Sequence, residues 1–280
     1  MPPPNVLAAI GNTPLVRLNA LAPANGAEIW VKLEYLNPTG SMKDRLALAM
    51  IEGAERDGLL ERGTAVVEYT GGSTGPALAL VCRAKGYRAR IVIADCFSEE
   101  RLLLMRALGA DLEVIPGVEG PGRVTAQDIQ NMVDRAGELA REPGTYAFCH
   151  GIGTSSSLMG VSAALKGRNA DVRIVALEPA SSPAITGGAK GAFAMQGWTG
   201  IVPPHFDRGR VDDVWTIEDE AAIEMTKRLA EEEGIFAGVS SGANVVGALR
   251  LADEIGPGAV VVTVAVDSGF KYMTGVPYGG

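Results

Sequence analysis

The sequence predicts an α/β protein built on mostly parallel sheets that helices cover on both faces. Two observations indicate this. Short runs rich in β-branched residues alternate with longer segments of helical pattern, and the short runs are apolar almost throughout. Strands buried on both faces have this character, and their alternation with helices is typical of parallel sheets. No long linker separates two halves, so any second domain is expected to share an intimate interface with the first.

The expected elements follow one another in this alternating order. Strands are predicted at the runs EIWVKLEY, TAVVEY, RARIVIA, DLEVIP, TYAFCH, VRIVALEP, DDVWTI and AVVVTVAV. Helices are predicted over residues 44–57, 75–85, 98–108, 125–141, 156–167, 218–233 and 241–255. Ligands of such folds gather where the carboxyl ends of strands meet the amino ends of helices.

Composition excludes several classes of protein. The chain has 280 residues, which suggests one large or two medium domains. Its net charge of −8 makes a nucleic-acid partner improbable. The longest apolar run is too short to span a bilayer and the amino terminus has no secretory pattern, so we expect a cytoplasmic protein without a membrane partner.

Cysteine and histidine usage argues against a metal or disulfide framework. The three cysteines, Cys82, Cys96 and Cys149, match no zinc spacing and lie in apolar segments, so we expect small buried side chains. Only two histidines are present, so a Ser-His-Asp or multi-histidine metal site would be hard to build. No metal is expected.

Three turns rich in small residues join a strand to a helix. They lie at residues 70–75, 151–157 and 240–242. Backbone N–H groups at a helix start attract anions, and glycines let the backbone approach closely. The second turn, GIGTSSS, is the best candidate for a phosphate site. It is neither a P-loop nor a G-x-G-x-x-G motif. Taken alone, each turn is better explained by ordinary capping of the helix by Ser and Thr, but three such turns beside a lysine weaken that explanation.

One lysine stands where these turns would converge. In NPTGSMKDR, residues 37–45, Lys43 follows a strand and a tight turn and opens a helix. A surface lysine near a helix cap is the simplest interpretation of such a residue taken alone. Together with three turns rich in small residues, it indicates a reactive amine at a ligand site.

These motifs, in this order, resemble those of a known family. GNTPLVRL, VKLEYLNPTGSMKDRLALAMIEGAERDG, TGGSTGPALAL, GIGTSSSLMG, EEEGIFAGVSSGA and VDSGFKY are similar to segments of cysteine synthases (O-acetylserine sulfhydrylases) and cystathionine β-synthases. These are fold-type II pyridoxal-phosphate enzymes, and the resemblance covers almost the whole chain. It implies two intimately packed three-layer α/β domains of the tryptophan synthase β type. Residues 1–35 and 144–280 would form the large cofactor-binding domain, and residues 36–143 the smaller mobile one. A homodimer is also implied.

The resemblance assigns roles to individual residues. Lys43 is similar to the lysine that forms the Schiff base with pyridoxal 5′-phosphate. Ser240 matches the serine at the pyridine nitrogen, and Ser73 stands where the family contacts the ring hydroxyl. The phosphate site is implied for Gly151, Gly153, Thr154, Ser155, Ser156 and Ser157. The substrate carboxylate site is implied for Thr70, Gly71, Gly72 and Thr74.

The implied reaction is β-elimination and β-replacement on an activated serine such as O-acetylserine, with sulfide or a thiol as the second substrate. The product would be cysteine or a related amino acid, and the enzyme a transferase or lyase of amino-acid biosynthesis. A serine at the ring nitrogen favours loss of a β leaving group, and Lys43 would take the α-proton. Three alternatives stay open: a cystathionine β-synthase-like activity, a serine/threonine dehydratase, and a cofactor-binding protein with weak catalysis.

The chain departs from the family pattern in three places. The family reads Thr-Ser-Gly-Asn-Thr-Gly at residues 70–75, so Gly71 replaces a serine and Ser73 an asparagine. The family's phosphate loop has glycine where Ser155 stands, and serine restricts the backbone there. A segment of about 30 residues, the size of a βα unit, is missing before GIGTSSS. It would carry a glutamine that contacts the substrate. Either the chain is shorter here, or residues are omitted between Gly144 and Cys149; we favour the second explanation.

Overall fold

The computed structural model describes most of the chain. The described residues are 5–24, 26–61, 63–120, 123–139, 145–147, 155–189, 191, 193, 198 and 200–279; for residues 126, 137 and 145–147 only the backbone is described. Within these ranges, no helix combines the length and the apolar character needed to cross a membrane.

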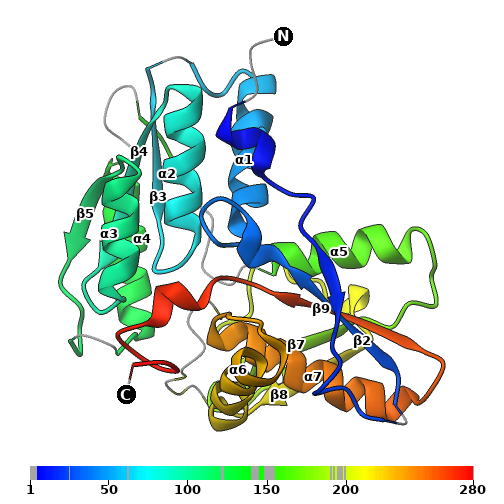
Figure 1. Ribbon diagram of the computed structural model, residues 1–280. Helices are drawn as coiled ribbons and strands as arrows, with labels where there is room; N and C mark the ends of the chain where they lie inside the picture. The colour runs from blue at the N-terminus through cyan, green and yellow to red at the C-terminus, as the bar shows by residue number, and fades with distance from the viewer. Residues whose placement is uncertain are drawn as a thin grey trace.

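One parallel sheet has the order β5-β4-β3-β6 (Figure 1). Its strands are β3 (Ala65–Tyr69), β4 (Arg88–Ala94), β5 (Asp111–Ile115) and β6 (Thr145–Ala147). Helices α1 (Lys43–Arg56), α2 (Thr74–Lys85), α3 (Glu99–Ala107) and α4 (Ala126–Leu139) surround it. Every residue of β3 is buried, Glu68 included, as a strand covered by helices on both faces requires. The carboxyl end of β3 leads directly into the turn at residues 70–73.

The remaining strands join segments from opposite ends of the chain. β2 (Glu28–Leu33) pairs in parallel with β9 (Val260–Ala265), and the short β1 (Leu15–Arg17) adds to β2 antiparallel. β7 (Val175–Pro179) and β8 (Asp213–Ile217) form a separate parallel pair. Helices α5 (Ser156–Lys166), α6 (Asp219–Glu233) and α7 (Val239–Ile255) accompany these strands, and β9 continues into the short η4 (Gly269–Tyr272) beside α3 (Figure 1).

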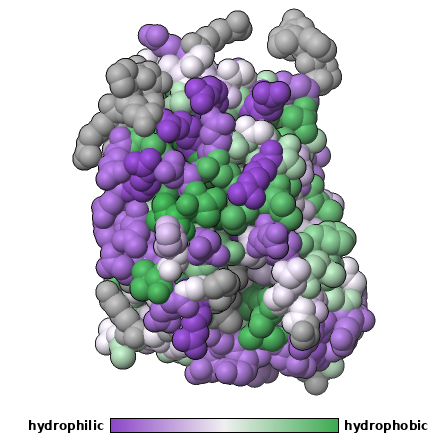
Figure 2. Space-filling view, turned by 90° about the vertical axis from the view of Figure 1, so that its left-hand side faces the viewer, coloured by the Kyte–Doolittle hydropathy of each residue, from purple (hydrophilic) through white to green (hydrophobic). Residues whose placement is uncertain are grey.

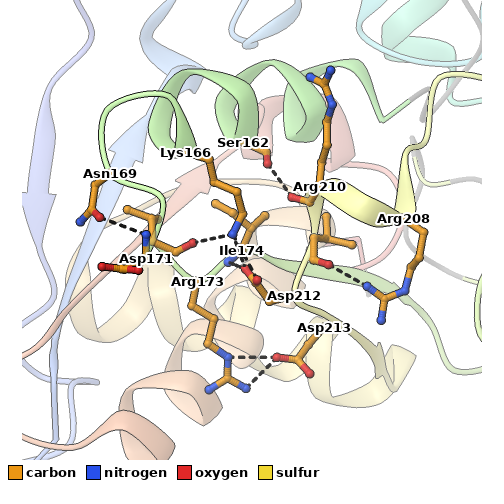
Figure 3. Close-up of polar contacts among 12 residues, drawn as sticks. Ser162, Lys166, Asn169, Asp171, Arg173, Ile174, Arg208, Arg210, Asp212 and Asp213 are labelled. Atoms are coloured by element: carbon orange, nitrogen blue, oxygen red, sulfur yellow. Dashed lines mark hydrogen bonds and ion pairs between the residues drawn. The ribbon is translucent and has the colours of Figure 1, made fainter.

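The polar contacts around α5 hold its carboxyl half in place (Figure 3). Ser162 Oγ donates a hydrogen bond to the Arg210 carbonyl at 2.6 Å. Lys166 Nζ lies 3.0 Å from Asp212 Oδ2, which also accepts from the Ile174 N–H at 2.7 Å. These contacts tie α5 to the segments that precede β7 and β8.

The side of the molecule that carries β5 exposes apolar groups among polar ones (Figure 2). β5 is the edge of its sheet, and its Val114 is exposed, as are Leu103 of α3 and Val118 beyond the strand. An ion pair between Arg88 and Asp111 at 2.8 Å places charges at the start of this edge. Charged residues of this kind discourage pairing with a foreign strand.

Two sequence-based expectations need correction here. The run TYAFCH was assigned to the large domain as the strand before the phosphate loop. Its described part, β6, instead pairs with β3, with Thr145 opposite Ala65 and Ala147 opposite Val67. The preference for omitted residues is also wrong, because the full sequence runs without a break from 1 to 280. Of the window between Gly144 and Cys149, where the omission was expected, the structure describes only residues 145–147.

The shortening leaves a gap between β9 and β7. Among the described strands, none pairs with the outer edge of β9 or with that of β7. A cavity of about 940 Å³ extends into this gap, lined by Val262 of β9, Leu177 of β7 and Leu165 of α5. Val262 is 59% exposed, although it belongs to an apolar run of the kind that is normally covered. Among the described residues, no strand therefore occupies this space, although the residues around it are suited to hold one.

Candidate active site

Four separate parts of the chain meet at one end of this cavity. Lys43 at the start of α1, Ser73 before α2, residues 155–157 at the start of α5 and Ser240 in the first turn of α7 all line it. The sequence predicted that these strand-to-helix turns would converge, and the structure brings their described members together. Gly151, Gly153 and Thr154 lie outside the described residues.

The loop before Lys43 is fixed by a buried carboxylate. Glu34, only 5% exposed, accepts two hydrogen bonds from Arg45 at 2.8 and 2.9 Å and one from Asn37 Nδ2 at 2.9 Å. Asp44 is fully buried and binds both the backbone N–H and the hydroxyl of Thr39. Gly40 has φ +73°, which glycine adopts without strain. These contacts explain why Lys43 follows this turn instead of standing on a solvated face.

Lys43 itself has the properties of a reactive amine. Burial lowers the pKa of its ammonium to about 8, and the nearby Asp267 carboxylate opposes that shift. The N–H of Met42 donates to the Val266 carbonyl at 3.0 Å, which anchors the start of α1 to the end of β9. A lysine with a pKa near 8 is partly neutral at physiological pH, and only the neutral amine is a nucleophile.

The turn after β3 explains one departure from the family. Thr70 Oγ1 accepts the Gly72 N–H at 3.0 Å, which closes the turn. At Gly71 a Cβ atom would lie 1.9 Å from the ring of Phe97, so the space for a side chain is already filled. Gly72 and Ser73 line the cavity, whereas Thr70, Gly71 and Thr74 are buried beside it. The glycine at position 71 is thus matched to Phe97.

The helices α5 and α7 present their amino ends to the cavity. Ser155, the N-cap residue of α5, has φ +63°, a conformation that a non-glycine residue adopts at a cost. The sequence predicted restricted freedom at this position. Ser240 is 4% exposed at the start of α7, and the adjacent Ser241 accepts the Val266 N–H at 2.9 Å. Both helix ends carry partial positive charge suited to an anion.

Sequence reasoning missed a group of buried charged residues around Ser73, two of which, Asp267 and Arg101, also line the cavity. Asp267, Lys271 and Arg101 are each at most 5% exposed and connect Ser73 to the carboxyl-terminal segment. The motif VDSGFKY, directly after the strand run AVVVTVAV, was a signal that could have identified Asp267 and Lys271. Arg101 gave no signal, because its partners are distant in sequence.

The residues present fit an aldehyde cofactor that carries a phosphate. The partly buried Lys43 is suited to the aldehyde. The amino end of α5, with its serine hydroxyls, is suited to the phosphate. The chain also matches the family described as "Pyridoxal-phosphate dependent enzyme" over residues 6–151 and 145–267. The chain belongs to this family. It is a pyridoxal-phosphate-dependent enzyme of the cysteine synthase type, with the fold-type II architecture of mostly parallel sheets.

Individual relatives extend the match over the whole chain. It is 38% identical to cysteine synthase of Staphylococcus aureus, covering 98% of this chain and 96% of the relative. A crystal structure of O-ureido-L-serine synthase superposes with a TM-score of 0.87 at 36% identity, over 96% of this chain and 93% of the other. O-acetylserine-dependent cystathionine β-synthase of Helicobacter pylori gives a TM-score of 0.88 at 30% identity, over 98% of both chains.

The comparison also locates the shortening in this pyridoxal-phosphate-dependent enzyme. The alignment with the S. aureus enzyme spans 306 positions but contains only 98% of the 280 residues, so about 30 positions fall opposite gaps in this chain. The family matches in two parts that both include residues 145–151, which is where the pattern is interrupted. This agrees with the edges of β9 and β7 that no described strand pairs with.

Proposed function

We propose that the protein catalyses β-replacement on an activated serine such as O-acetylserine, with sulfide or a thiol as the second substrate. The observation that carries this proposal is the position of Lys43, a lysine of lowered pKa in one cavity with the amino ends of α5 and α7. The relatives named for cysteine synthase, O-ureido-L-serine synthase and O-acetylserine-dependent cystathionine β-synthase share an activated or substituted serine, which supports the substrate class.

The cofactor supplies an electron sink that stabilises negative charge at the α-carbon of a bound amino acid. Lys43 would hold the cofactor through Nζ, and the same nitrogen, as a free amine, would accept the α-proton of the substrate. Its lowered pKa suits both tasks, because a base is most effective when its pKa lies near the working pH. Ser240 would face the ring nitrogen and Ser73 the ring hydroxyl.

The phosphate is assigned to the amino end of α5, with Ser155, Ser156 and Ser157 and the preceding Gly151, Gly153 and Thr154. The substrate carboxylate is assigned to the turn containing Thr70, Gly71, Gly72 and Thr74. Because Phe97 fills the side-chain space of Gly71, that residue offers only its backbone N–H. Carboxylate recognition therefore depends on backbone donors and on Thr hydroxyls more than in relatives with a serine there.

One assay separates the candidate reactions. Purified protein is incubated with O-acetylserine, with and without sulfide, and acetate, cysteine and keto acid are measured. Sulfide-dependent cysteine supports β-replacement, whereas keto acid without sulfide indicates a dehydratase. Homocysteine as the second substrate tests the cystathionine β-synthase-like activity. If the protein binds the cofactor but forms no product, it is a cofactor-binding protein with weak catalytic activity. The missing βα unit favours this alternative.

A chemical test locates the cofactor on Lys43. Borohydride reduction of the yellow protein should fix the cofactor covalently to Lys43, since this amine is the one held in the cavity with Ser240. Peptide mapping by mass spectrometry identifies the labelled residue. Lys43→Ala is expected to lose the label and the yellow colour that depends on it. A label on Lys32 or Lys271 would contradict the assignment.

Three further features are proposed for the whole protein. Residues 1–35 and 144–280 would act as the large cofactor-binding domain and residues 36–143 as the smaller mobile one, except that β6 belongs with the smaller because it pairs with β3. The protein would be a cytoplasmic homodimer. Light scattering measures the mass in solution, and a monomer at micromolar concentration would refute the dimer. Cell fractionation of the native host tests the location.

A further inference from the structure

A second buried lysine stands directly behind the cavity wall. Lys271 of η4 is 5% exposed, and its Nζ donates a hydrogen bond to Ser73 Oγ at 3.1 Å. Ser73 lines the cavity that Lys43 and Ser240 share, whereas Lys271 does not. The hydrogen bond of Lys271 to the cavity lining is therefore the one to Ser73. None of the roles assigned above uses it.

Ser73 is held from a second side by a carboxylate. Its hydroxyl donates to Asp267 Oδ2 at 3.0 Å, and Tyr272 OH donates to the same oxygen at 2.9 Å. Arg101 in turn donates to Tyr272 OH at 2.9 Å and to the Gly71 carbonyl at 2.7 Å. The network joins α3 and the turn after β3 to the carboxyl-terminal segment, and it fixes the position of Ser73.

The single hydroxyl hydrogen of Ser73 determines whether this residue can donate a hydrogen bond to a ligand in the cavity. A hydroxyl has one hydrogen, and here that hydrogen points to Asp267, so only acceptor capacity faces the cavity. Asp267 Oδ2 keeps the Tyr272 hydrogen bond if the Ser73 hydrogen turns away. Lys271 can continue to donate to Ser73 in either arrangement. The serine can thus switch from acceptor to donor without leaving its partners unsatisfied.

The charges around Lys271 favour the donor arrangement when the ligand is an anion. Burial is the largest influence on the pKa of Lys271 and lowers it, and Arg101 lowers it further. Asp267 and Asp44 oppose this shift, and the resulting pKa is about 8. Tyr272 beside it stays a neutral phenol, because burial raises its pKa well above the ordinary value. At neutral pH the wall behind Ser73 therefore carries an ammonium group.

We propose that Lys271 is a positioning residue for the cofactor: it holds the Ser73 hydroxyl at the cavity wall and, as an ammonium, supports that hydroxyl as a donor to an anionic ring oxygen. This rests on the proposed function, since it takes the pyridoxal ring to lie against Ser73. A serine is one bond shorter than the asparagine that cysteine synthases carry there and has one donor hydrogen. Lys271 compensates for this shorter side chain, because its ammonium group adds a positive charge on the side of Ser73 away from the cavity.

The test uses the holoenzyme and two readouts that need no turnover. The cofactor dissociation constant is measured by equilibrium dialysis, and the visible spectrum of the bound cofactor is titrated from pH 6 to 10. Lys271→Met is expected to weaken cofactor binding about tenfold, the effect of losing one charge-assisted hydrogen bond. It should also move the spectral midpoint to higher pH by about one unit, because the anionic oxygen loses its cation.

Three further variants distinguish the effect of the Lys271 charge from the effects of its hydrogen bond and of a general loss of stability. Lys271→Arg keeps charge and donors and should restore the wild-type midpoint. Lys271→Gln keeps a donor without charge and should follow the Met variant; it also provides the result if the Met variant does not fold. Tyr272→Phe removes the link between Arg101 and Asp267 but leaves both contacts of Ser73. It also removes the hydrogen bond that Asp267 Oδ2 keeps when the Ser73 hydrogen turns away, so it should lower the melting temperature and move the midpoint less than Lys271→Met does.

Several results would overturn the inference. The first is a folded Lys271→Met or Lys271→Gln protein with the cofactor dissociation constant and spectra of the wild type. The second is a Lys271→Arg protein whose spectral midpoint is shifted as far as that of Lys271→Met. The third is a Tyr272→Phe protein with an equally large shift of the midpoint. Wild-type protein that binds the cofactor but forms no product overturns the proposed function alone. Wild-type protein that does not bind the cofactor overturns both.

Discussion

At the scale of single residues, two lysines share one carboxylate at the active site. Lys43 and Lys271 both have a pKa lowered to about 8 by burial, and Asp267 opposes the shift in each case. A buried ammonium is costly, and one carboxylate compensates only part of that cost. Without the cofactor, these two lysines therefore lower the free energy of unfolding, as expected where a reactive amine is required.

The pH dependence of stability should show this cost. Below pH 8 Lys43 is protonated in both the folded and the unfolded chain, so its penalty is constant. Between pH 8 and 10.5 the unfolded chain binds more protons, so the free energy of unfolding rises with pH. Lys43→Met should stabilise the cofactor-free protein at pH 7 by up to about 3 kcal/mol, with the gain vanishing near pH 10.5. Urea unfolding at several pH values measures it.

A control uses a lysine of opposite character. Lys85 forms an ion pair with Glu55 at 2.8 Å, and that pair raises the pKa of Lys85. Lys85→Met should therefore give no gain at pH 7. A Lys43→Met protein that is no more stable than wild type at pH 7 would contradict the claim that the Lys43 ammonium destabilises the folded protein.

The second residue-scale prediction concerns Gly71. A Cβ at this position would lie 1.9 Å from the Phe97 ring, so Gly71→Ala should lower the free energy of unfolding by about 1–3 kcal/mol. Phe97→Leu in the same chain should recover part of the loss, a coupling that a double-mutant cycle measures. Gly72→Ala is the control, because its nearest neighbour would be Thr70 Oγ1 at 4.0 Å. Equal losses at positions 71 and 72 would contradict this explanation.

At the scale of elements, α5 begins under strain. Its N-cap residue Ser155 has φ +63°, which costs a non-glycine residue roughly 1 kcal/mol. Ser155→Gly should relieve this and raise stability by about 0.5 kcal/mol, since glycine also loses more entropy on folding. Ser157→Gly, inside the helix, should instead cost about 0.5–1 kcal/mol. Thermal unfolding of both variants checks the signs, and a loss in the Ser155 variant would refute the strain.

The elements were largely predictable from local pattern. All seven helices expected from the sequence lie within two residues of their observed bounds, because their apolar spacing and flanking turns are local signals. β1 was missed, since a strand of three residues has too little periodicity to detect. β6 was assigned to the wrong sheet, because strand pairing depends on partners such as Ala65 that are far away in sequence.

At the scale of the whole molecule, the site itself was only half predictable. Lys43 and the serine-rich turns could be found because each lies at a strand-to-helix junction. The network of Ser73, Asp267 and Lys271 could not, since Ser73 and Lys271 are 198 residues apart and only the tertiary fold joins them. The shortening near residues 145–151 was visible in the sequence, but the gap it leaves between β9 and β7 was not.

The packing of the whole fold also controls thiol reactivity. Cys82 and Cys96 are at most 1% exposed, and burial raises the pKa of each thiol to about 12. In a Cys149→Ser background, which removes the cysteine outside the described residues, both thiols should resist a disulfide reagent until the protein unfolds. Absorbance of the released thiolate follows the reaction in native and urea-treated protein. Rapid labelling of the native state would contradict structural roles for these cysteines.

The pairing of β2 with β9 also determines when the site can be completed during synthesis. Glu28 pairs with Val260 and Leu33 with Ala265, so the strand before Lys43 has its partner almost at the end of the chain. The sheet of β3 to β6 is contiguous and can form while translation continues. Lys43 leaves the ribosome early but meets Asp267 only after the last strand has emerged. A nascent chain therefore contains no assembled cofactor site, and a prematurely terminated one never acquires it.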